Sequence, residues 1–394
     1  MHVLYHHRTQ GTGVEAVHIM GIVSALVGLG HHVKIIGPPG TDPGSKPAVS
    51  ADDHRGALKA AWRAISDHTP EVLFEILEIG YGLFTFFRLI RFLRANKVDV
   101  LYERYALFQF GGVLAACVSK VPIVLEVNDS AVVERVRPLR NKRIATWFEK
   151  KIFHNADALM TISTCFKRKI LTHDLGERKI QVMPNAINPD VVDPLKYERD
   201  TVREEYILGS GPILGCVGFF VPWHGMLMLI DAFAKLSAHY DSIHLLLVGD
   251  GPERQAIENR VGDLGLADKV TFTGNVHHDR VPAFIRSFDV AVIPDANEYC
   301  SPMKMFEYMG MAKPIVAPSY SPIQEVLEHR RNALLFEPRD VGGLSQALRT
   351  LIDDRQLRHR LGKNAREDVL AKHTWRNNAL QVEREFERIR SNAS

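Results

Sequence analysis

Residues 299–314 read YCSPMKMFEYMGMAKP, and the apolar run Ile315–Ala317 follows directly. The pair Ser301-Pro302 predicts the start of a helix, because serine favours the N-cap position and proline favours the first helical turn. A mostly apolar helix that leads into a short apolar run is typical of a parallel sheet covered by crossover helices on both faces. The stretch therefore predicts an α/β fold.

The start of this predicted helix also suits a bound anion. The backbone amides of Met303 and Lys304 have no partner inside a helix that begins at Ser301, so they point outward from its N-terminus. Lys304 puts a cation where the helix dipole disfavours one, and a bound diphosphate would relieve that conflict. Glu307 lies one turn later on the same face, where its carboxylate can accept hydrogen bonds from a ribose diol. The alternative is a Lys304–Glu307 ion pair on the protein surface.

Apolar runs of strand length alternate with helical patterns along the whole chain, and the alternation restarts after about residue 210. The runs are Val3–His6, Val33–Gly37, Val98–Tyr102, Ile123–Val127 and Ala158–Ile162 in the first half, and Ile213–Val217, His244–Val248, Val270–Thr273 and Val290–Ile293 in the second. We predict two tandem, doubly wound, Rossmann-like domains. The Pro- and Asn-containing segment Val182–Asp193 marks the boundary, which we place between residues 192 and 193.

Composition excludes several classes of protein. A chain of 394 residues exceeds the ~250–300 residues at which single cores stop growing, so two domains are expected. The net charge of +3 is too small for a chain-wide nucleic-acid footprint, and no nucleic-acid partner is expected. The four cysteines lie far apart without metal-ligand spacing, which argues against a disulfide framework or a metal site. The N-terminus lacks a signal-peptide pattern and no run reaches ~20 apolar residues, so we expect a cytoplasmic protein.

The segment Glu71–Lys97 departs from the alternating pattern, because acidic residues come first, basic residues come last and aromatic residues and leucines lie between them. One interpretation is a long helix packed on the first sheet. The other is a basic and aromatic surface that touches the inner face of a membrane or a lipid-linked acceptor.

Three glycine turns are further candidates for a ligand site. The loop Gly11-Thr12-Gly13 follows the first predicted strand, and the backbone there can approach an anion or a sugar at a helix N-terminus. No acidic residue ends the second strand, so a nicotinamide dinucleotide is not expected. Gly249-Asp250 and Asn275-Val276 each follow a predicted strand, at the edge where open α/β sheets bind ligands. A plain tight turn is the alternative in each case.

In this order, the motifs resemble the retaining nucleotide-sugar glycosyltransferases of family 4, which have the GT-B fold of two Rossmann-like domains facing across a cleft. The resemblance rests on Gly11–Gly13, Val182–Asn185, Val217-Gly218 with Pro222 and Gly225, Gly249–Pro252, Phe272–Val276, Ser301–Pro314 and His373–Trp375. It implies an acceptor domain of residues 1–192 completed by a C-terminal helix at 375–394. It also implies a donor domain of residues 193–374.

The sequence departs from the family's pattern at several positions. Tyr299 stands where the family has a glutamate, and Asn128 stands where it often has a histidine. Phe219 and His224 occupy the usual arginine and lysine positions that clasp the diphosphate. Lys304 is then the best remaining counterion for the leaving group, and His224 can assist only when protonated.

The altered positions also limit the expected mechanism. Asn128 can donate an amide hydrogen bond but cannot act as a base. We favour same-face attack assisted by the leaving phosphate, and Asp129 or Glu126 would be the nucleophile of a covalent alternative.

The resemblance implies a UDP- or GDP-linked sugar as donor and a sugar, lipid-linked or small-molecule acceptor, with no cofactor and no metal. The donor site would comprise Gly11, Gly13, His224, Gly249, Asp250, Asn275, Val276, Ser301, Met303, Lys304 and Glu307, with Lys304, Asn128 and Asp129 in the reaction. A nucleotide-sugar epimerase and a non-catalytic sugar-nucleotide-binding relic remain as alternatives.

Overall fold

The apolar runs form two parallel sheets, each in its own unit of the chain. The computed structural model describes residues 1–11, 13–44, 71–133 and 139–393. By internal packing the chain divides into one unit of Met1–Met183 with Ala379–Ser394 and a second unit of Pro184–Asn378. The division falls at 183/184 and not at 192/193, because Ile187 and Val192 belong to the hydrophobic core of the second unit.

The first unit contains a six-stranded parallel sheet in the order β2-β1-β3-β4-β5-β6. Its strands are β1 (His2–His6), β2 (His32–Ile36), β3 (Val100–Arg104), β4 (Ile123–Val127), β5 (Ala158–Thr161) and β6 (Ile180–Val182). Its helices are α1 (Gly13–Gly28), α3 (Glu71–Ala95), α4 (Gly111–Ser119), α5 (Lys142–Asn155) and α6 (Thr164–Leu171), together with most of α15 (Trp375–Ala393).

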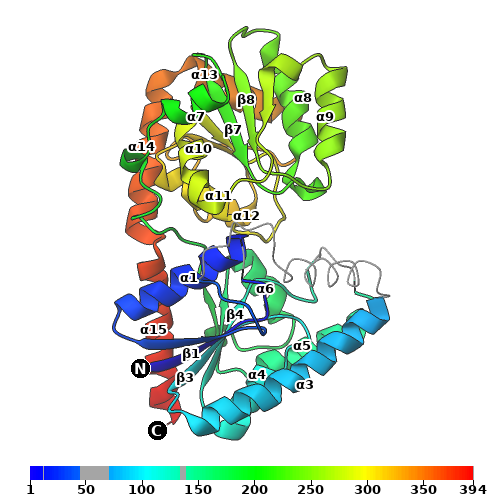
Figure 1. Cartoon of the computed structure of the whole chain (residues 1–394), viewed down its shortest axis with the longest axis vertical. Coiled ribbons are helices and arrows are strands. Elements are labelled where there is room, and N and C mark those ends of the chain that lie inside the picture. The colour runs from blue at the N-terminus through cyan, green and yellow to red at the C-terminus, as the bar shows by residue number, and fades with distance from the viewer. Residues whose placement is uncertain (12, 45–70, 134–138, 394) are drawn as a thin grey trace. The chain divides into compact units, whose positions relative to one another are not determined.

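Helices cover both faces of this sheet, as right-handed crossovers between parallel strands require. Figure 1 shows α1 and α15 on one side of the sheet and α3, α4 and α5 on the other. The ring of Phe386 on α15 lies edge-on to Tyr102 of β3, with centroids 6.1 Å apart. The C-terminal helix therefore completes the core of the first unit, as expected.

The second unit repeats the architecture with the strand order β12-β11-β10-β7-β8-β9. Its strands are β7 (Ile213–Val217), β8 (His244–Val248), β9 (Val270–Phe272), β10 (Val290–Val292), β11 (Ile315–Pro318) and β12 (Leu334–Phe336). Its α-helices are α7 (Asp200–Glu205), α8 (Met226–Ser237), α9 (Arg254–Asp263), α10 (Val281–Ser287), α11 (Met303–Gly310), α12 (Ser321–Gln324), α13 (Val341–Asp353) and α14 (Arg355–Lys372). Short 3-10 turns lie at Glu177–Lys179, Pro194–Lys196, Pro222–His224, Ala267–Lys269 and His278–Arg280.

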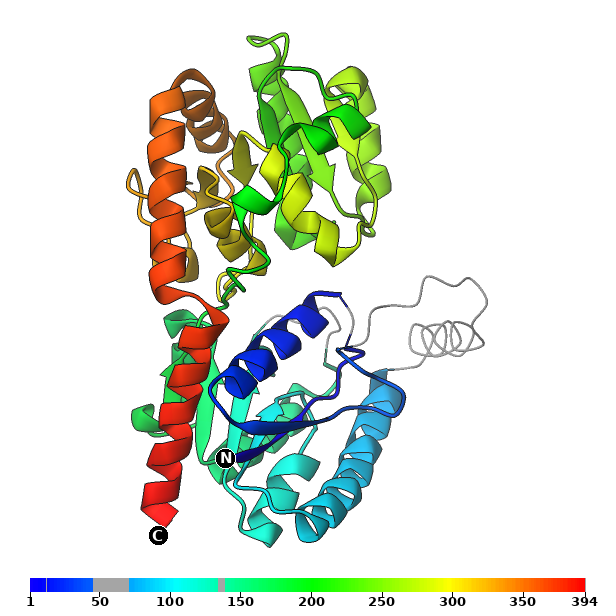
Figure 2. The same ribbon diagram turned by 60° about the vertical axis from the view of Figure 1, so that its left-hand side comes forward.

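Two hydrophobic clusters lie on the two faces of the second sheet. Helices α8 and α13 pack together over one face with α9, and α11 packs against α14 and α10 over the other (Figures 1 and 2). Strands β7, β8, β10 and β11 contribute side chains to both clusters, because successive residues point to opposite faces of the sheet.

The α/β class and the two tandem Rossmann-like domains are confirmed. The predicted strands match the observed ones to within a few residues, whereas the short strands β6 and β12 were not predicted. In the described part of the chain, no helix has the length and apolar character needed to cross a bilayer.

Candidate functional site

In the second unit, candidate site residues gather where the strand order changes direction. The chain leaves β7 toward β8 on one side and later returns to place β10 on the other, so the carboxyl ends of these two strands form a topological switch point, the place where open α/β sheets bind ligands. Gly218 follows β7, and Asp295 follows β10. A Cβ added at Gly225 would lie 2.7 Å from the Asp295 Cβ, so the loop after β7 closely approaches the end of β10.

Lys304 extends from the first turn of α11 toward the loop after β7 at this switch point. Its side chain is only 8% exposed, and among the described residues its Nζ atom has no hydrogen-bond partner. A Cβ placed on Gly218 would lie 3.1 Å from that Nζ, so a larger residue at 218 would crowd the lysine. A buried ammonium group without a partner carries a large desolvation cost unless an anion binds there.

Two further unpartnered polar atoms lie near the start of α11. Ser301 is buried, and neither its Oγ nor the Oδ1 of buried Asn185 has a partner among the described residues. The Asn185 amide donates to the carbonyl oxygen of Ser301 at 2.5 Å, which holds the two residues together. The prediction that Ser301 is the N-cap is wrong: Pro302 takes that position, without a side-chain cap hydrogen bond. The Ser301 hydroxyl therefore remains available to a ligand.

His224 lies in the same region and is neutral at pH 7. Its Nδ1 is 2.5 Å from the carbonyl oxygen of Phe219, which can only accept, so Nδ1 carries the proton. Burial and the nearby charge of Lys304 lower the pKa of His224 to about 4. Phe219 itself is 57% exposed and holds the ring only through its backbone. In the ligand-free protein, Lys304 is thus the cation of this pair.

Glu307 is buried one turn further along α11. Burial raises the pKa of its carboxyl group, while His278 and Lys304 act in the opposite direction. His278 Nε2 is the ion-pair partner, 3.4 Å from Glu307 Oε1. The alternative of a Lys304–Glu307 surface pair is therefore wrong, because both side chains are buried and Lys304 Nζ has no partner in the described structure.

The glycine turn after β8 packs directly on the loop after β7. Gly249 has φ +135°, and a Cβ there would lie 1.9 Å from the Gly218 carbonyl oxygen. The Phe220 amide donates to the Asp250 carbonyl oxygen at 2.8 Å, so the two loops are hydrogen-bonded. Met303 is half-buried at the first position of α11. Exposed Asn275 and half-buried Val276 follow β9, at the carboxyl edge of the same sheet.

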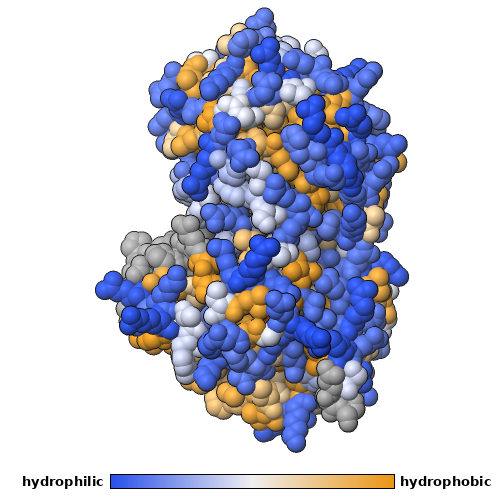
Figure 3. Space-filling view, turned by 180° about the vertical axis from the view of Figure 1, so that it is seen from behind, coloured by the Kyte–Doolittle hydropathy of each residue, from blue (hydrophilic) through white to orange (hydrophobic). Residues whose placement is uncertain are grey.

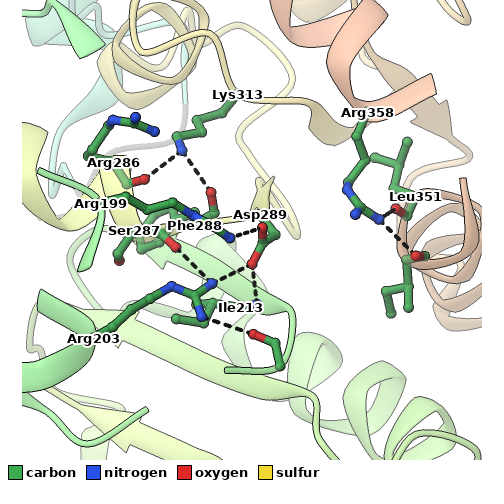
Figure 4. Close-up of polar contacts among 12 residues, drawn as sticks. Arg199, Arg203, Ile213, Arg286, Ser287, Phe288, Asp289, Lys313, Leu351 and Arg358 are labelled. Carbon is green, nitrogen blue, oxygen red and sulfur yellow. Dashed lines mark hydrogen bonds and ion pairs between the residues drawn. The ribbon is translucent and has the colours of Figure 1, made fainter. Parts of the chain in front are cut away.

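A second buried lysine, Lys313, shows how the fold satisfies such a group when it is structural. Its Nζ donates to the carbonyl oxygens of Arg286 and Phe288 at 2.7 and 2.8 Å (Figure 4). Burial, followed by the nearby Arg286, lowers the pKa of Lys313 to about 7. Asp289 beside it accepts from Arg203 at 2.6 Å. Among the described residues, Lys313 thus has two acceptors for its buried ammonium group, whereas Lys304 has none.

The first unit has its own polar cluster at the carboxyl ends of β1 and β3, where its strand order also changes direction. Glu103 is fully buried and lies 2.6 Å from His6 Nδ1, and Gln109 Nε2 lies 3.1 Å from the same atom. Glu103 Oε1, Gln109 Oε1 and His7 Nε2 are buried without partners among the described residues. Burial lowers the pKa of His7 to about 4. These neutral and acidic groups suit the hydroxyl groups of a polar ligand.

Asn128 and Glu126 belong to a hydrogen-bonded group at the end of the neighbouring strand β4. The Asn128 amide donates to Glu126 Oε1 at 2.7 Å, and Arg104 donates to the same oxygen at 2.6 Å. Burial alone would raise the pKa of Glu126, but His18, Arg104 and the Asn128 hydrogen bond together lower it. Glu126 is therefore an ionised, engaged carboxylate, and its hydrogen bond orients Asn128.

Asp129 and the residues after it form the loop that leaves β4. Asp129 Oδ1 accepts from the Ser130 amide at 2.8 Å. The buried carboxylate of Glu149 accepts from the Ser130 hydroxyl and the Ala131 amide at 2.5 and 2.7 Å. The same carboxylate is hydrogen-bonded to His173 Nε2 at 2.7 Å. Because Glu149 lies on α5, its hydrogen bonds to Ser130 and Ala131 fix the loop against this helix.

The first glycine loop lies in the first unit, where α1 begins at Gly13. Gly11 and Gly13 have φ of +65° and +59°, conformations that favour glycine, and Thr12 lies outside the described residues. A Cβ on Gly11 would approach Pro43 at 3.1 Å, whereas Gly13 faces open space. The structure thus divides the predicted donor set: Gly11 and Gly13 belong to the first unit and the remaining members to the second.

Profiles of two glycosyltransferase families match nearly the whole chain. The profile described as "Glycosyltransferase Family 4" covers residues 13–191, and the one described as "Glycosyl transferases group 1" covers residues 198–368. The chain belongs to the family 4 glycosyltransferases.

Individual relatives of this family 4 member are distant. It is 25% identical to alpha-D-kanosaminyltransferase of Streptomyces kanamyceticus, over 64% of this chain and 67% of that protein. It is also 25% identical to a GDP-mannose-dependent alpha-(1-6)-phosphatidylinositol monomannoside mannosyltransferase of Mycobacterium tuberculosis, over 57% of this chain and 60% of the relative. The alignments thus span about two thirds or less of the curated relatives' own length.

A solved structure confirms the GT-B type of fold. The crystal structure of Anabaena HepE in complex with UDP superposes with a TM-score of 0.74 at 16% identity, over 98% of this chain and 100% of that one. At this identity the likeness concerns the fold alone.

Several site residues of this family member were not selected from the sequence. Asn185 was assigned to the linker, and Asp295, which accepts from the Tyr320 hydroxyl at 2.9 Å, was not singled out. In the first unit, His6 was taken as an ordinary strand residue, and Glu103 falls just beyond the predicted run Val98–Tyr102. Asp295, His6 and Glu103 are polar residues at or just after the carboxyl end of an apolar strand, and that placement was the signal by which the sequence could have identified them. Among the described residues, no group of three or more His, Cys, Asp or Glu side chains could hold a metal ion.

Proposed function

We propose that this protein transfers a sugar from a nucleoside-diphosphate sugar to an acceptor hydroxyl with retention of anomeric configuration. The observation that carries the proposal is the buried, unpartnered Nζ of Lys304 at the start of α11. A diphosphate would satisfy this group, the free amides of the first helical turn and the Ser301 hydroxyl together. Membership of family 4 supports the same reaction class.

The donor is a UDP- or GDP-linked sugar. HepE, which shares the fold, was crystallised with UDP, and the mycobacterial relative is named as GDP-mannose-dependent. We assign the ribose diol to Glu307, whose buried carboxylate forms a long ion pair of 3.4 Å with His278. The base would lie against the turns at Gly249-Asp250 and Asn275-Val276, at the carboxyl edge of the sheet.

In the proposed step, the bond between the anomeric carbon and the β-phosphate oxygen breaks while the acceptor oxygen bonds to the same face of that carbon. The acceptor proton passes to the leaving phosphate, so no protein base is needed. Lys304 stabilises the negative charge that develops on the diphosphate, which is the charge-stabilising role that contributes most in such reactions. Asn128, oriented by Glu126, would donate to a sugar hydroxyl, and Asp129 is the nucleophile if the reaction is instead covalent.

We further propose that the reaction needs neither a metal ion nor a cofactor, since Lys304 and the helix amides supply positive charge at the diphosphate. We place the enzyme in the cytoplasm at the inner face of a membrane, where a lipid-linked acceptor would be reached. Cys117, Cys165 and Cys216 are free thiols, which suits a reducing compartment.

The test is to incubate the protein with UDP- and GDP-linked sugars, with and without sugar and lipid-linked acceptors. We expect acceptor-dependent release of nucleoside diphosphate and a product with the donor's anomeric configuration, both unchanged by a chelator. Release of no diphosphate but conversion of the donor sugar would indicate an epimerase. Binding of nucleotide without any turnover across the panel would indicate a non-catalytic relic.

A further inference from the structure

In its first part, between residues 73 and 87, helix α3 turns small residues inward and bulky apolar residues outward, whereas Leu89 and Leu93 are buried further along. Gly82 and Thr85 are buried, and a Cβ on Gly111 of α4 would lie only 2.2 Å from the Gly82 carbonyl oxygen. The outward positions between residues 73 and 87 carry side chains that are 48–67% exposed, namely Leu73, Ile76, Leu77, Leu83, Phe84 and Phe87. A helix at an ordinary water-facing surface has the opposite arrangement.

The acidic residues of α3 from residue 73 onward, Glu75 and Glu78, do not interrupt this apolar stripe. Glu75 accepts from the Arg140 amide at 2.9 Å, and Glu78 forms an ion pair with Arg8, so both carboxylates are engaged by neighbouring parts of the unit. The next exposed side chains toward the end of the helix are Arg91 and Arg94. The outward face is therefore apolar over its first part and basic at its end.

Helices α4 and α5 extend the apolar stripe. Leu114 and Val118 on α4 and Ile144 and Trp147 on α5 are 41–56% exposed. Aromatic rings join the helices. The ring of Phe148 on α5 packs edge-on against Trp147, and its centroid lies 5.9 Å from that of Phe110, just before α4. Phe110 in turn contacts Gly82 of α3. Figure 1 shows the three helices side by side, and Figure 3 shows hydrophobic residues at the bottom of the rear face of this unit. We call this region the α3–α5 surface.

The exposed charges of the α3–α5 surface are all positive among residues 73–95, 111–119 and 142–155. Its exposed lysines and arginines are Arg91, Arg94, Lys142, Arg143 and Lys151. The carboxylates in these ranges are the engaged Glu75 and Glu78 and the fully buried Glu149. A combination of exposed aromatic rings with basic residues matches the boundary between acyl chains and anionic headgroups.

We propose that the α3–α5 surface docks on an anionic lipid bilayer. The apolar side chains would enter the acyl boundary, while the lysines and arginines contact lipid phosphates. A second copy of the chain fits less well, because two such surfaces would bring like charges together. That this docking brings the enzyme to a lipid-linked acceptor rests on the proposed function. The docking on a bilayer does not depend on that function.

The test is co-sedimentation of the full chain with vesicles of phosphatidylcholine alone and with roughly 30 mol% phosphatidylglycerol. We expect binding to the anionic vesicles only, weakened by salt. The double variant Arg91→Glu/Arg94→Glu should bind at least roughly 30-fold more weakly, since each basic residue near the bilayer strengthens binding about fivefold. The double variant Phe84→Ser/Phe87→Ser should lose roughly tenfold or more, because its rings no longer enter the acyl boundary.

Matched controls carry the same changes outside this surface. Arg355→Glu/Arg360→Glu on α14 and Val27→Ser/Leu195→Ser replace exposed residues and should bind like the wild type. Melting curves confirm that each variant is folded. The proposal is overturned if the wild type does not bind vesicles, or binds them regardless of lipid charge. It is also overturned if the control variants lose as much vesicle binding as the test variants. A third contrary result is that the wild type self-associates without lipid and Phe84→Ser/Phe87→Ser abolishes this self-association. Diphosphate release with a soluble acceptor is measured separately, so failure of lipid binding leaves the proposed reaction untouched.

Discussion

His224 and Lys304 converge on one backbone position, since a Cβ on Gly218 would lie 3.6 Å from His224 Nδ1 and 3.1 Å from Lys304 Nζ. The Nδ1–H of His224 faces the Phe219 carbonyl, so the neutral ring presents a lone pair at Nε2 and cannot donate there. A diphosphate held by Lys304 would repel this lone pair and favour the imidazolium form.

We predict that diphosphate binding raises the pKa of His224 from about 4, so that binding takes up protons and tightens as the pH falls through the bound-state pKa toward 4. Calorimetry of UDP and GDP binding near about pH 6, in two buffers of different ionisation enthalpy, measures the uptake. His224→Asn is the control, because the diphosphate's own titration is common to both proteins. Equal proton uptake by wild type and variant would exclude this role for His224.

The Glu307 carboxylate gives a second prediction at this scale. Glu307→Gln should weaken nucleoside-diphosphate binding by about 1–3 kcal/mol, the cost of leaving a buried hydrogen-bonding partner poorly satisfied. Folding should change little, since the amide keeps the side chain's shape and the ion pair with His278 is 3.4 Å long. The ribose contact would be ruled out if Glu307→Gln bound UDP and GDP as tightly as the wild type does. It would also be ruled out if the wild type bound the 2′-deoxy analogues as tightly as UDP and GDP themselves.

At the scale of elements, the close contact of α3 with α4 depends on glycine. We predict that Gly111→Ala destabilises the first unit by about 1–3 kcal/mol, because the added methyl group would lie 2.2 Å from the Gly82 carbonyl oxygen and 2.7 Å from the Phe86 amide. Gly80→Ala is the matched change on the exposed side of α3, where a Cβ has open space, and it should stabilise by about 0.5–1 kcal/mol. Urea unfolding followed by circular dichroism measures both, and equal effects would contradict the packing.

The sequence predicted the elements more reliably than their contacts. Unbroken apolar strands such as Ile213–Val217 are recognisable in the sequence, because both faces of a parallel strand are buried. The start of α11 was placed one residue too early, since Ser301 favours an N-cap but its hydroxyl points elsewhere. Likewise, Glu307 pairs with His278 from a distant segment, and no local spacing rule can anticipate such a partner.

For the whole molecule, histidines whose pKa values are lowered in the folded protein predict acid sensitivity. Burial, the first cause in each case, lowers the pKa of His7, His224 and His373 to about 4, against an ordinary value of 6.5 in the unfolded chain. Between these values the unfolded chain binds more protons than the folded protein, so stability is present above about pH 6.5 and is lost as the pH falls toward 4. Melting temperatures across this range should fall steadily, and less steeply for His373→Gln. A melting temperature that stays constant or rises on acidification would contradict the burial of these rings.

The central claim, that Lys304 is the cation of a diphosphate site, is tested most directly by melting temperatures of the wild type, Lys304→Met and Lys313→Met, with and without UDP or GDP. We predict that Lys304→Met melts higher than the wild type without ligand, because it removes an unpartnered buried charge that costs about 1–3 kcal/mol. The variant should also lose the rise that a saturating nucleotide produces by mass action. Lys313→Met, which removes hydrogen bonds to two carbonyl oxygens, should melt lower yet keep that rise. A full nucleotide-induced rise in Lys304→Met would contradict the claim.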